Sequence, residues 1–296
     1  MLINRLAIIG VGLIGGSLAR ALKRKRACGK VVGYGRDTAH LQKAVDLGVI
    51  DEFGLTIANA VTDADVIVLA TPLATTEPLL KSMCSYLKDT AVITDVGSAK
   101  GSVVDAARKT LDERFPRFVP GHPIAGKETS GVEASTADLF ESHRVILTPL
   151  PETSINALEL VTRMWETTGA EVVHLSVDQH DEILAATSHL PHMLAYALVD
   201  CLAGMQERDE IFKFAAGGFA DFTRIASSHP KMWNDICFSN RKQLLKALDL
   251  FDEYLNRIRS AIESDNSDEL LKIFTRAKET RDLFTKLRSK PNDAPE

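Results

Sequence analysis

Short apolar runs alternate with helical patterns along roughly the first 175 residues of the chain. The runs that predict strands are Arg5–Ile9, Val31–Tyr34, Val66–Ala70, Ala91–Val96, Val145–Leu147 and Glu171–His174. The spacing of apolar residues predicts helices at Leu13–Lys25, Thr38–Leu47, Thr75–Leu87, Ser102–Arg114 and Ser154–Thr168. Strands that alternate with helices predict an α/β domain over residues 1–175, with a mainly parallel sheet covered on both faces.

The pattern changes after about residue 175, where strand signals give way to helical periodicity. Long helices are predicted at Asp178–Leu202, Pro230–Ser264 and Ser267–Leu287. We expect residues 176–288 to form an all-helical domain that contributes to substrate binding and forms a homodimer, because helices this apolar need a surface to bury against. The tail 289–296, which contains two prolines, is predicted to be disordered.

Charge and cysteine content exclude several classes of protein. The net charge of -5 argues against a nucleic-acid-binding protein, which needs a basic face. The four cysteines form no CxxC pair and no disulfide framework, so a reducing, cytoplasmic setting is expected. The apolar stretch Leu6–Leu22 is interrupted by glycines and followed by Lys23–Arg26, which indicates a buried strand and helix rather than a signal peptide. No other stretch is long enough to cross a membrane.

The first chemical motif is the glycine-rich segment Gly10–Ser17, which follows a predicted strand and opens a predicted helix. In this G-x-G-x-x-G pattern, Gly10 permits a tight turn, Gly12 lets the backbone approach a pyrophosphate, and Gly15 lets helix and strand pack closely. Free N–H groups at the helix start, where Leu13 and Ile14 lie, favour phosphate binding. The segment predicts a Rossmann-type dinucleotide-binding domain.

The residues after the second predicted strand leave the choice between NAD and NADP open. An NAD site normally has an acidic residue there, which binds the ribose 2′-hydroxyl. Here Gly35 takes that position and Arg36 follows it, which favours tolerance of a 2′-phosphate, whereas Asp37 would serve an NAD site. Thr71-Pro72 ends the third strand and is predicted to lie beside the cofactor; a strand merely terminated by proline is the alternative.

A second candidate for chemistry is the segment Val119–Gly131, predicted to be a rigid loop because it is rich in glycine and proline. It contains His122 and Glu128 and follows Asp95–Lys100, the end of a predicted strand. Five motifs, which follow one another along the chain, resemble those of the prephenate/arogenate (cyclohexadienyl) dehydrogenase family. They are Gly12–Ser17, Asp95–Lys100, Gly121–Gly126, Ser188–His192 and Gly217–Ala226 with Met232-Trp233, so the resemblance extends over both predicted domains.

The resemblance implies NAD(P)-dependent oxidative decarboxylation of prephenate to 4-hydroxyphenylpyruvate, of arogenate to tyrosine, or of both, in tyrosine biosynthesis. Such a reaction needs a general base for the ring hydroxyl, and His122 is the candidate because a neutral imidazole accepts a proton near pH 7. Ser98 is expected to hydrogen-bond this imidazole and fix its orientation. The alternative is a histidine that only caps the turn at Pro123.

Arg224 is the candidate for binding a substrate carboxylate, because a guanidinium group matches a carboxylate in geometry and charge. The ring carboxylate leaves as neutral CO2, so holding it tightly would stabilise the ground state. We therefore expect Arg224 to bind the side-chain carboxylate. Pairing with Asp221, three positions earlier on the same helix, is the alternative.

His189 and His192 share one face of a predicted helix. The resemblance favours His192 as substrate-facing and His189 as a supporting residue, with Trp233 a weaker candidate. No cysteine or carboxylate set completes a metal site, so no metal is expected.

Glu128 and Lys127 bear on the choice of substrate. The carboxylate of Glu128 would pair with the ammonium group of arogenate, whereas Lys127 would compensate for the keto acid of prephenate. Both substrates therefore stay open.

Two other functions are alternatives to a prephenate or arogenate dehydrogenase. A β-hydroxyacid dehydrogenase or imine reductase typically has a catalytic lysine in the first long helix of its second domain, and Asp178–Leu202 contains none. A non-catalytic NAD(P)-sensing dimer would need no convergent Ser98, His122 and Arg224.

Overall fold

The computed structural model describes residues 1–127, 129–206 and 208–289. It divides into two compact units, Met1–Leu244 and Leu245–Glu296. The last strand ends at His174, and among the described residues beyond it every regular element is a helix. The expected change from α/β to all-helical structure is therefore confirmed.

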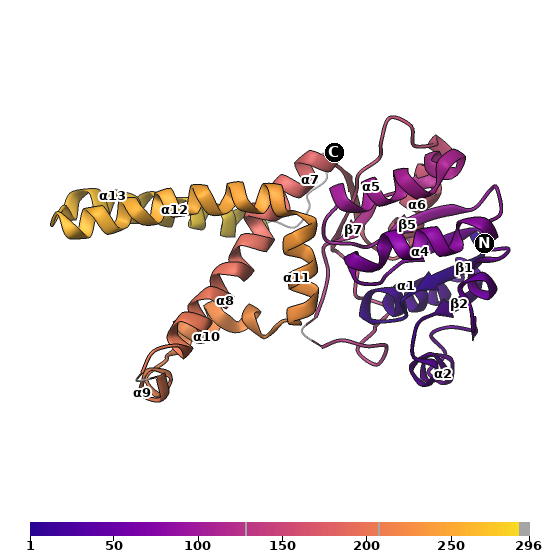
Figure 1. Cartoon of the computed structure of the whole chain (residues 1–296), viewed down its shortest axis with the longest axis horizontal. Coiled ribbons are helices and arrows are strands. Elements are labelled where there is room, and N and C mark those ends of the chain that lie inside the picture. Colours follow the sequence, from indigo (N-terminus) through magenta and orange to yellow (C-terminus); the bar gives the residue numbers. More distant parts are fainter. Residues whose placement is uncertain (128, 207, 290–296) are drawn as a thin grey trace. The chain divides into compact units, whose positions relative to one another are not determined.

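A six-stranded parallel sheet forms the centre of the first unit, with the strand order β3-β2-β1-β4-β5-β6 (Figure 1). Its strands are β1 (Ile3–Ile9), β2 (Cys28–Tyr34), β3 (Glu52–Phe53), β4 (Val66–Leu69), β5 (Val92–Asp95) and β6 (Phe118–Val119). The order reverses between β1 and β4, and in such sheets ligands bind at the carboxyl ends of the strands beside this switch point. The Rossmann-type expectation is confirmed.

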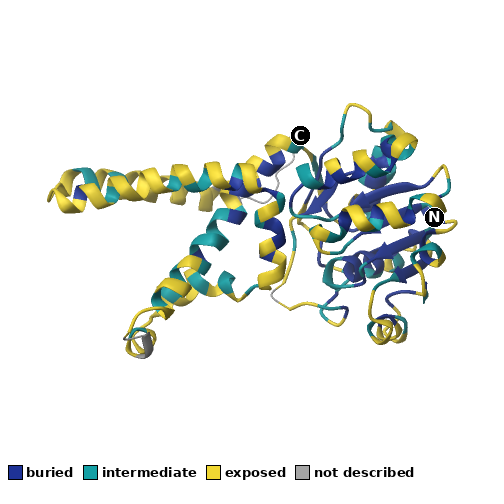
Figure 2. Ribbon diagram, in the orientation of Figure 1, coloured by how far each residue is buried: buried dark blue, intermediate teal, exposed yellow. Residues whose placement is uncertain are grey.

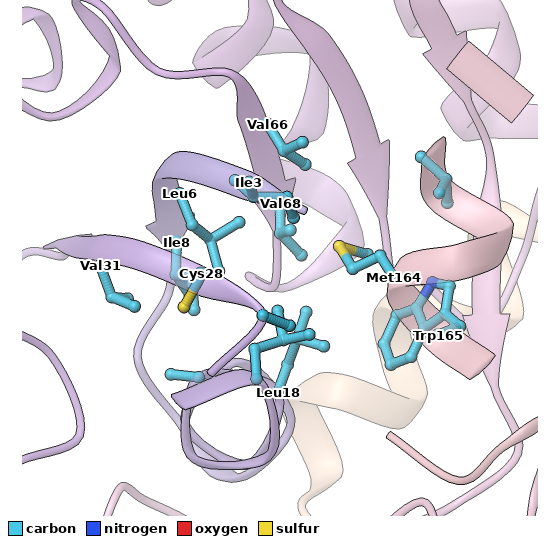
Figure 3. Packing of buried hydrophobic residues seen from close by; sticks show 14 of the residues in the cluster. Ile3, Leu6, Ile8, Leu18, Cys28, Val31, Val66, Val68, Met164 and Trp165 are labelled. Atoms are coloured by element: carbon cyan, nitrogen blue, oxygen red, sulfur yellow. The ribbon is translucent and has the colours of Figure 1, made fainter. Parts of the chain in front are cut away.

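Helices cover both faces of this sheet. They are α1 (Leu13–Arg24), α2 (Thr38–Asp46), α3 (Ile57–Val61), α4 (Thr76–Met83), α5 (Gly101–Thr110) and α6 (Ile155–Thr167). Alternate residues of β1 belong to two different hydrophobic clusters: Ile8 packs with Leu18 of α1 and Met164 of α6 (Figure 3), whereas Ile9 packs with Leu80 of α4. Both faces of β1 are buried, as expected for a parallel strand between two helical layers.

The last predicted strands form a second sheet instead of extending the first. This three-stranded sheet has the order β7-β8-β9, with β7 (Gly121–Pro123) antiparallel to β8 (Arg144–Leu147) and parallel pairing of β8 with β9 (Glu171–His174). The prediction of one sheet missed β7 because its three residues lie in a glycine- and proline-rich segment. Pairing with β8, rather than local propensity, makes the segment extended.

Two of the long helices predicted in the second half are interrupted. The helix expected at Asp178–Leu202 is α7 (Val177–Leu184), a π-helical turn (Ala185–His189) and α8 (Leu190–Ala203). The helix expected at Pro230–Ser264 ends at Asn240, between α11 (Pro230–Ser239) and α12 (Arg241–Glu263). The side chain of Asn240 bonds to Asp181 and His189, so tertiary contacts stabilise this break. Short helices α9 (Arg208–Lys213) and α10 (Gly217–Thr223) lie between α8 and α11 in the chain.

The second unit contains most of α12 together with α13 (Ser267–Ser289), which a tight turn connects. Arg257 of α12 forms an ion pair with Glu269 of α13, so the two helices form a hairpin (Figure 1). The tail expected to be disordered lies outside the described residues from 290 on. No helix in the described ranges is long and apolar enough to cross a membrane.

Candidate active site

Three glycines between β1 and α1 create an open backbone surface. Gly10 has a φ of 101°, and a Cβ there would lie 2.4 Å from the carbonyl oxygen of Ala70. A Cβ on Gly15 would lie 2.4 Å from the carbonyl oxygen of Gly10, so only glycine lets helix and strand approach this closely. Gly12 has no atom within 4 Å of an added Cβ and is the N-cap of α1, without a side-chain cap. The backbone here therefore fits a pyrophosphate at the helix N-terminus.

A cavity of about 340 Å³ adjoins these glycines. Its lining includes six of the predicted cofactor residues: Gly10, Gly12, Arg36, Asp37, Thr71 and Pro72. Leu13, Ile14 and Gly15 begin α1 directly beyond the loop. His40 was not predicted; it also lines the cavity, and its Nε2 donates a 2.8 Å hydrogen bond to the carbonyl oxygen of Val11. The cavity has the position and lining that a dinucleotide requires.

The residue that follows β2, where NAD sites normally have an acid, is a glycine, and an arginine comes next. Gly35 and the exposed Arg36 follow β2. The next residue, Asp37, is the N-cap of α2, where its Oδ1 accepts hydrogen bonds from the backbone N–H groups of Ala39 and His40. Its carboxylate is thus engaged by the helix.

A buried ion pair links the end of β5 to the start of β7. Lys100 is fully buried, and its Nζ donates to Oδ2 of Asp95 and, at 2.6 Å, to the carbonyl oxygen of Gly121. Oδ1 of Asp95 accepts from the backbone N–H of Gly121 at 3.1 Å. Both backbone groups of Gly121 are therefore held, and this fixes the position of the next residue, His122.

His122 lies on β7, not in a loop as predicted, and is 9% exposed. Its Nδ1 is 2.9 Å from Nε2 of His180, and Nδ1 of His180 is 2.8 Å from Oδ1 of Asp181. Burial, and then the neighbouring His180 and Lys100, lower the pKa of His122 well below its ordinary value. His122 is therefore neutral at pH 7 and able to accept a proton.

The paired histidines on the helices differ in their surroundings. His189 is 1% exposed, and its Nδ1 accepts a 3.2 Å hydrogen bond from the side-chain amide of Asn240. Burial lowers the pKa of His189 to about 4. His192 stacks on Trp233 of α11, with ring centroids 3.6 Å apart, and its Nδ1 donates to the carbonyl oxygen of Ser188.

Arg224 begins the short helical turn after α10, close enough to His192 for its charge to act on that ring. Burial, and to a smaller extent the charge of Arg224, lower the pKa of His192. The structure thus brings Arg224, His192 and Trp233 together, although they are separated in the sequence. No cluster of three metal-binding side chains exists among the described residues.

Comparison with known proteins identifies the family. Residues 18–174 match the model of the prephenate dehydrogenase nucleotide-binding domain, and residues 176–276 match that of the prephenate dehydrogenase dimerization domain. The chain is 38% identical to the cyclohexadienyl dehydrogenase of Zymomonas mobilis over 94% of this chain and 95% of the relative. It is 37% identical to the prephenate dehydrogenase of Bacillus subtilis over 94% of this chain and 76% of the relative.

A solved structure gives the same result. The prephenate dehydrogenase of Aquifex aeolicus, crystallised with hydroxyphenyl propionate and NAD+, superposes with a TM-score of 0.89 and 40% identity, over 95% of this chain and 98% of the other. The chain belongs to the prephenate dehydrogenase family. As a member of this family it is an oxidoreductase that uses NAD or NADP. The non-catalytic and imine-reductase alternatives are thereby set aside.

Within this prephenate dehydrogenase family member, one contact predicted for a site residue differs from expectation. The hydrogen bond expected between Ser98 and His122 is not present among the described residues; the Nδ1 of His122 bonds to His180 instead. Lys127 is exposed and lies 3.3 Å from the hydroxyl of Thr136, whereas Glu128 lies outside the described residues.

Sequence reasoning missed His180, Asp181 and Asn240 as site residues. The partner of His180 is 58 positions away in the chain, and the partners of Asp181 include Lys100, 81 positions away. No local spacing connects such residues. The adjacent histidine and aspartate at the start of a helix were the only available signal.

Proposed function

We propose that this protein is an NAD(P)-dependent dehydrogenase that oxidatively decarboxylates prephenate, arogenate or both, as a homodimer. The observation that carries the proposal is His122: a buried, neutral imidazole held beyond the carboxyl end of β5, in the domain that binds the dinucleotide. The dimerization-domain match supports the homodimer. Four free cysteines support a cytoplasmic location.

The proposed domains are residues 1–175 for the dinucleotide and 176–288 for substrate binding and dimerisation. The two family matches, 18–174 and 176–276, support this boundary. The compact units divide later, at Leu244, because α7 and α11 pack with the α/β part, as the hydrogen bonds from Lys100 and Gly101 to Asp181 of α7 illustrate.

The proposed mechanism begins with proton abstraction by His122 Nε2 from the hydroxyl on ring C4. A nicotinamide dinucleotide held at the cavity beside Gly10 and Gly12 would supply the acceptor for the hydride that leaves C4. Loss of CO2 then returns an electron pair to the ring, which becomes an aromatic phenolate. His122 returns its proton to the phenolate oxygen, so the residue is regenerated and no proton is consumed.

The direct test is turnover of prephenate and of arogenate with NAD+ or NADP+, followed by the absorbance of the reduced cofactor. His122→Asn should lower kcat by about 10²-fold or more, because a general base contributes a factor of this size. His143→Asn, at an exposed histidine of the same unit, should leave the rate unchanged. Absence of reduced cofactor with all four combinations would contradict the proposed function.

Arg224 is proposed to bind the side-chain carboxylate of the substrate, next to His192. Arg224→Ala should raise KM by about 10- to 100-fold, the value of a charge-assisted hydrogen bond, and lower kcat much less. Arg163→Ala, at an exposed position of α6, is the control. A fall in kcat with unchanged KM would contradict this assignment, because Arg224 would then act on the transition state and not on substrate binding.

Glu128 is proposed to set the preference between the two acids through the ammonium group that only arogenate carries. Glu128→Gln should lower the arogenate-to-prephenate ratio of kcat/KM. An unchanged ratio would remove Glu128 from this role.

A further inference from the structure

We propose that Asp181 and His180 are positioning residues for His122. They hold its Nε2 free of hydrogen and stabilise the cation that forms when His122 accepts the substrate proton. This inference rests on the proposed function of His122 as the base. It assigns a role to two buried side chains that are otherwise unexplained.

The carboxylate of Asp181 determines the direction of the hydrogen bonds. Its Oδ1 accepts from the backbone N–H of Lys100 at 2.8 Å, and its Oδ2 accepts from that of Gly101 at 2.8 Å. Burial alone would raise the pKa of Asp181, but the hydrogen bonds from His180 and from these two N–H groups outweigh it and lower the pKa. Asp181 is therefore ionised and can only accept hydrogen bonds.

The protonation of both imidazoles follows from this one constraint. Because Asp181 accepts, Nδ1 of His180 carries the hydrogen at their 2.8 Å contact. In a neutral imidazole the other nitrogen then has a lone pair, so Nε2 of His180 accepts. It faces Nδ1 of His122 at 2.9 Å, which must therefore donate. Nε2 of His122 is left with the lone pair that a general base needs.

The same chain of hydrogen bonds compensates charge during the reaction. His122 is buried, and its neighbours Lys100, His180 and His189 all disfavour a positive charge on it. An imidazolium in such a place is costly without a counter-ion. The carboxylate of Asp181, linked to His122 through His180, supplies negative charge. Its role is comparable to that of the aspartate in a Ser-His-Asp triad.

Asp181 also holds the backbone at the start of α5 in place. A test must separate this structural role from the effect of Asp181 on His122. Asp181 bonds to the N–H groups that begin α5, next to the Lys100 that holds Gly121. A rate loss alone would therefore not distinguish the two roles. The pH dependence of the rate does, because the charge of the Asp181 carboxylate changes the pKa of His122, whereas a purely structural role would not.

The variant Asp181→Asn tests the proposal, with Glu182→Gln as the matched control at the adjacent, exposed acid of α7. Asn keeps the shape of the side chain but removes the negative charge that compensates the His122 cation, so kcat should fall by about 10²-fold or more with little change in KM. In 15N NMR of the histidine-labelled protein, His122 should be the Nδ1–H tautomer. His122→Asn assigns its signal among the eight histidines.

The pH profile and a second variant provide two further tests of the proposal. The lower limb of the kcat/KM pH profile should move to lower pH in Asp181→Asn, because His122 loses its negative counter-charge. If Asp181→Asn does not fold, His180→Gln should lower kcat with little change in KM, because the carboxylate is then no longer linked to His122. An Nε2–H tautomer in the unmodified protein, or a slow Asp181→Asn variant with an unchanged pH profile, would overturn the proposal. The NMR result needs no substrate, so it fails independently of the proposed reaction.

Discussion

Apolar residues are mostly buried in the α/β region and mostly exposed in the hairpin of α12 and α13. Strands β1, β4 and β5 are almost completely buried, and two hydrophobic clusters fill the space between sheet and helices (Figure 2). Among residues 245–286, by contrast, Ala261 alone is buried. The exposed apolar residues of the hairpin are Leu245, Leu250, Tyr254, Leu255, Ile262, Leu271, Phe274, Leu283 and Phe284.

The difference shows what each region needs to be stable. The α/β region buries its apolar surface within one chain, and it can therefore hold charged groups such as Lys100 at fixed positions. The hairpin presents apolar side chains along both helices, and burying them requires another surface. A second copy of the same chain is the partner that we propose.

The largest expected effect comes from removing the buried cation of the α/β region. Lys100→Met leaves the carboxylate of Asp95 buried without its partner, and the free energy of unfolding should fall by about 3–5 kcal/mol. Lys278→Met removes an exposed i,i+4 pair with Asp282 in α13 and should change stability by only about 0.5 kcal/mol. Urea unfolding measures both. Equal effects would mean that burial does not distinguish the two ion pairs.

Acid should destabilise the α/β-containing unit selectively. His122, His180 and His189 have pKa values lowered by burial, whereas residues 245–296 contain no histidine. A histidine with a lowered folded pKa stabilises the fold fully above its unfolded pKa of about 6.5, and this contribution is lost as the pH falls below that value. For His189, with a pKa of about 4, the loss between these two values is about 3 kcal/mol.

Unfolding followed from pH 7 to pH 4 measures this loss. The slope should be smaller in His189→Gln, which has no proton to bind at that position. A slope that is the same in both proteins would show that His189 does not contribute.

A charge introduced on the hairpin should weaken dimerisation, whereas a charge at an exposed apolar residue of the α/β region should not. Phe274→Asp places a charge on the apolar surface of α13 and should raise the dimer dissociation constant by about 10- to 100-fold. Leu55→Asp, at an apolar residue that is 77% exposed in the α/β region, should leave it unchanged. Analytical ultracentrifugation distinguishes the outcomes. A monomeric unmodified protein would contradict the proposed homodimer.

The smallest expected effect concerns the cofactor. A side chain at Gly35 would meet only Leu41, at an ordinary contact distance of 3.6 Å, so an aspartate fits there. Gly35→Asp should lower the NADP-to-NAD ratio of kcat/KM by about tenfold, since the carboxylate repels a 2′-phosphate and binds a 2′-hydroxyl. Gly35→Ala, without the charge, should keep the original ratio.

Local patterns predicted most of the fold. The period of apolar residues located β1, β2, β4 and β5 of the main sheet and most helices, often to within a few residues, but missed the two-residue strands β3 and β6. The glycine spacing predicted the dinucleotide site because each glycine meets a local requirement of the backbone, such as a tight turn or the close approach of helix and strand. The separate second sheet and the break at Asn240 could not be predicted in this way, because strand pairing and side-chain contacts from distant segments stabilise them.

The sequence by itself determined the Rossmann-type domain, the helical second half and the family, and it indicated His122 as the candidate base. These depend on periodicity and on motifs that a few neighbouring residues complete. Only the tertiary structure decided that His122 lies on a strand and that its Nδ1 meets His180, backed by Asp181, rather than Ser98. The protonation state of a buried imidazole depends on which donors and acceptors surround it, and the chain supplies these from positions far apart in the sequence.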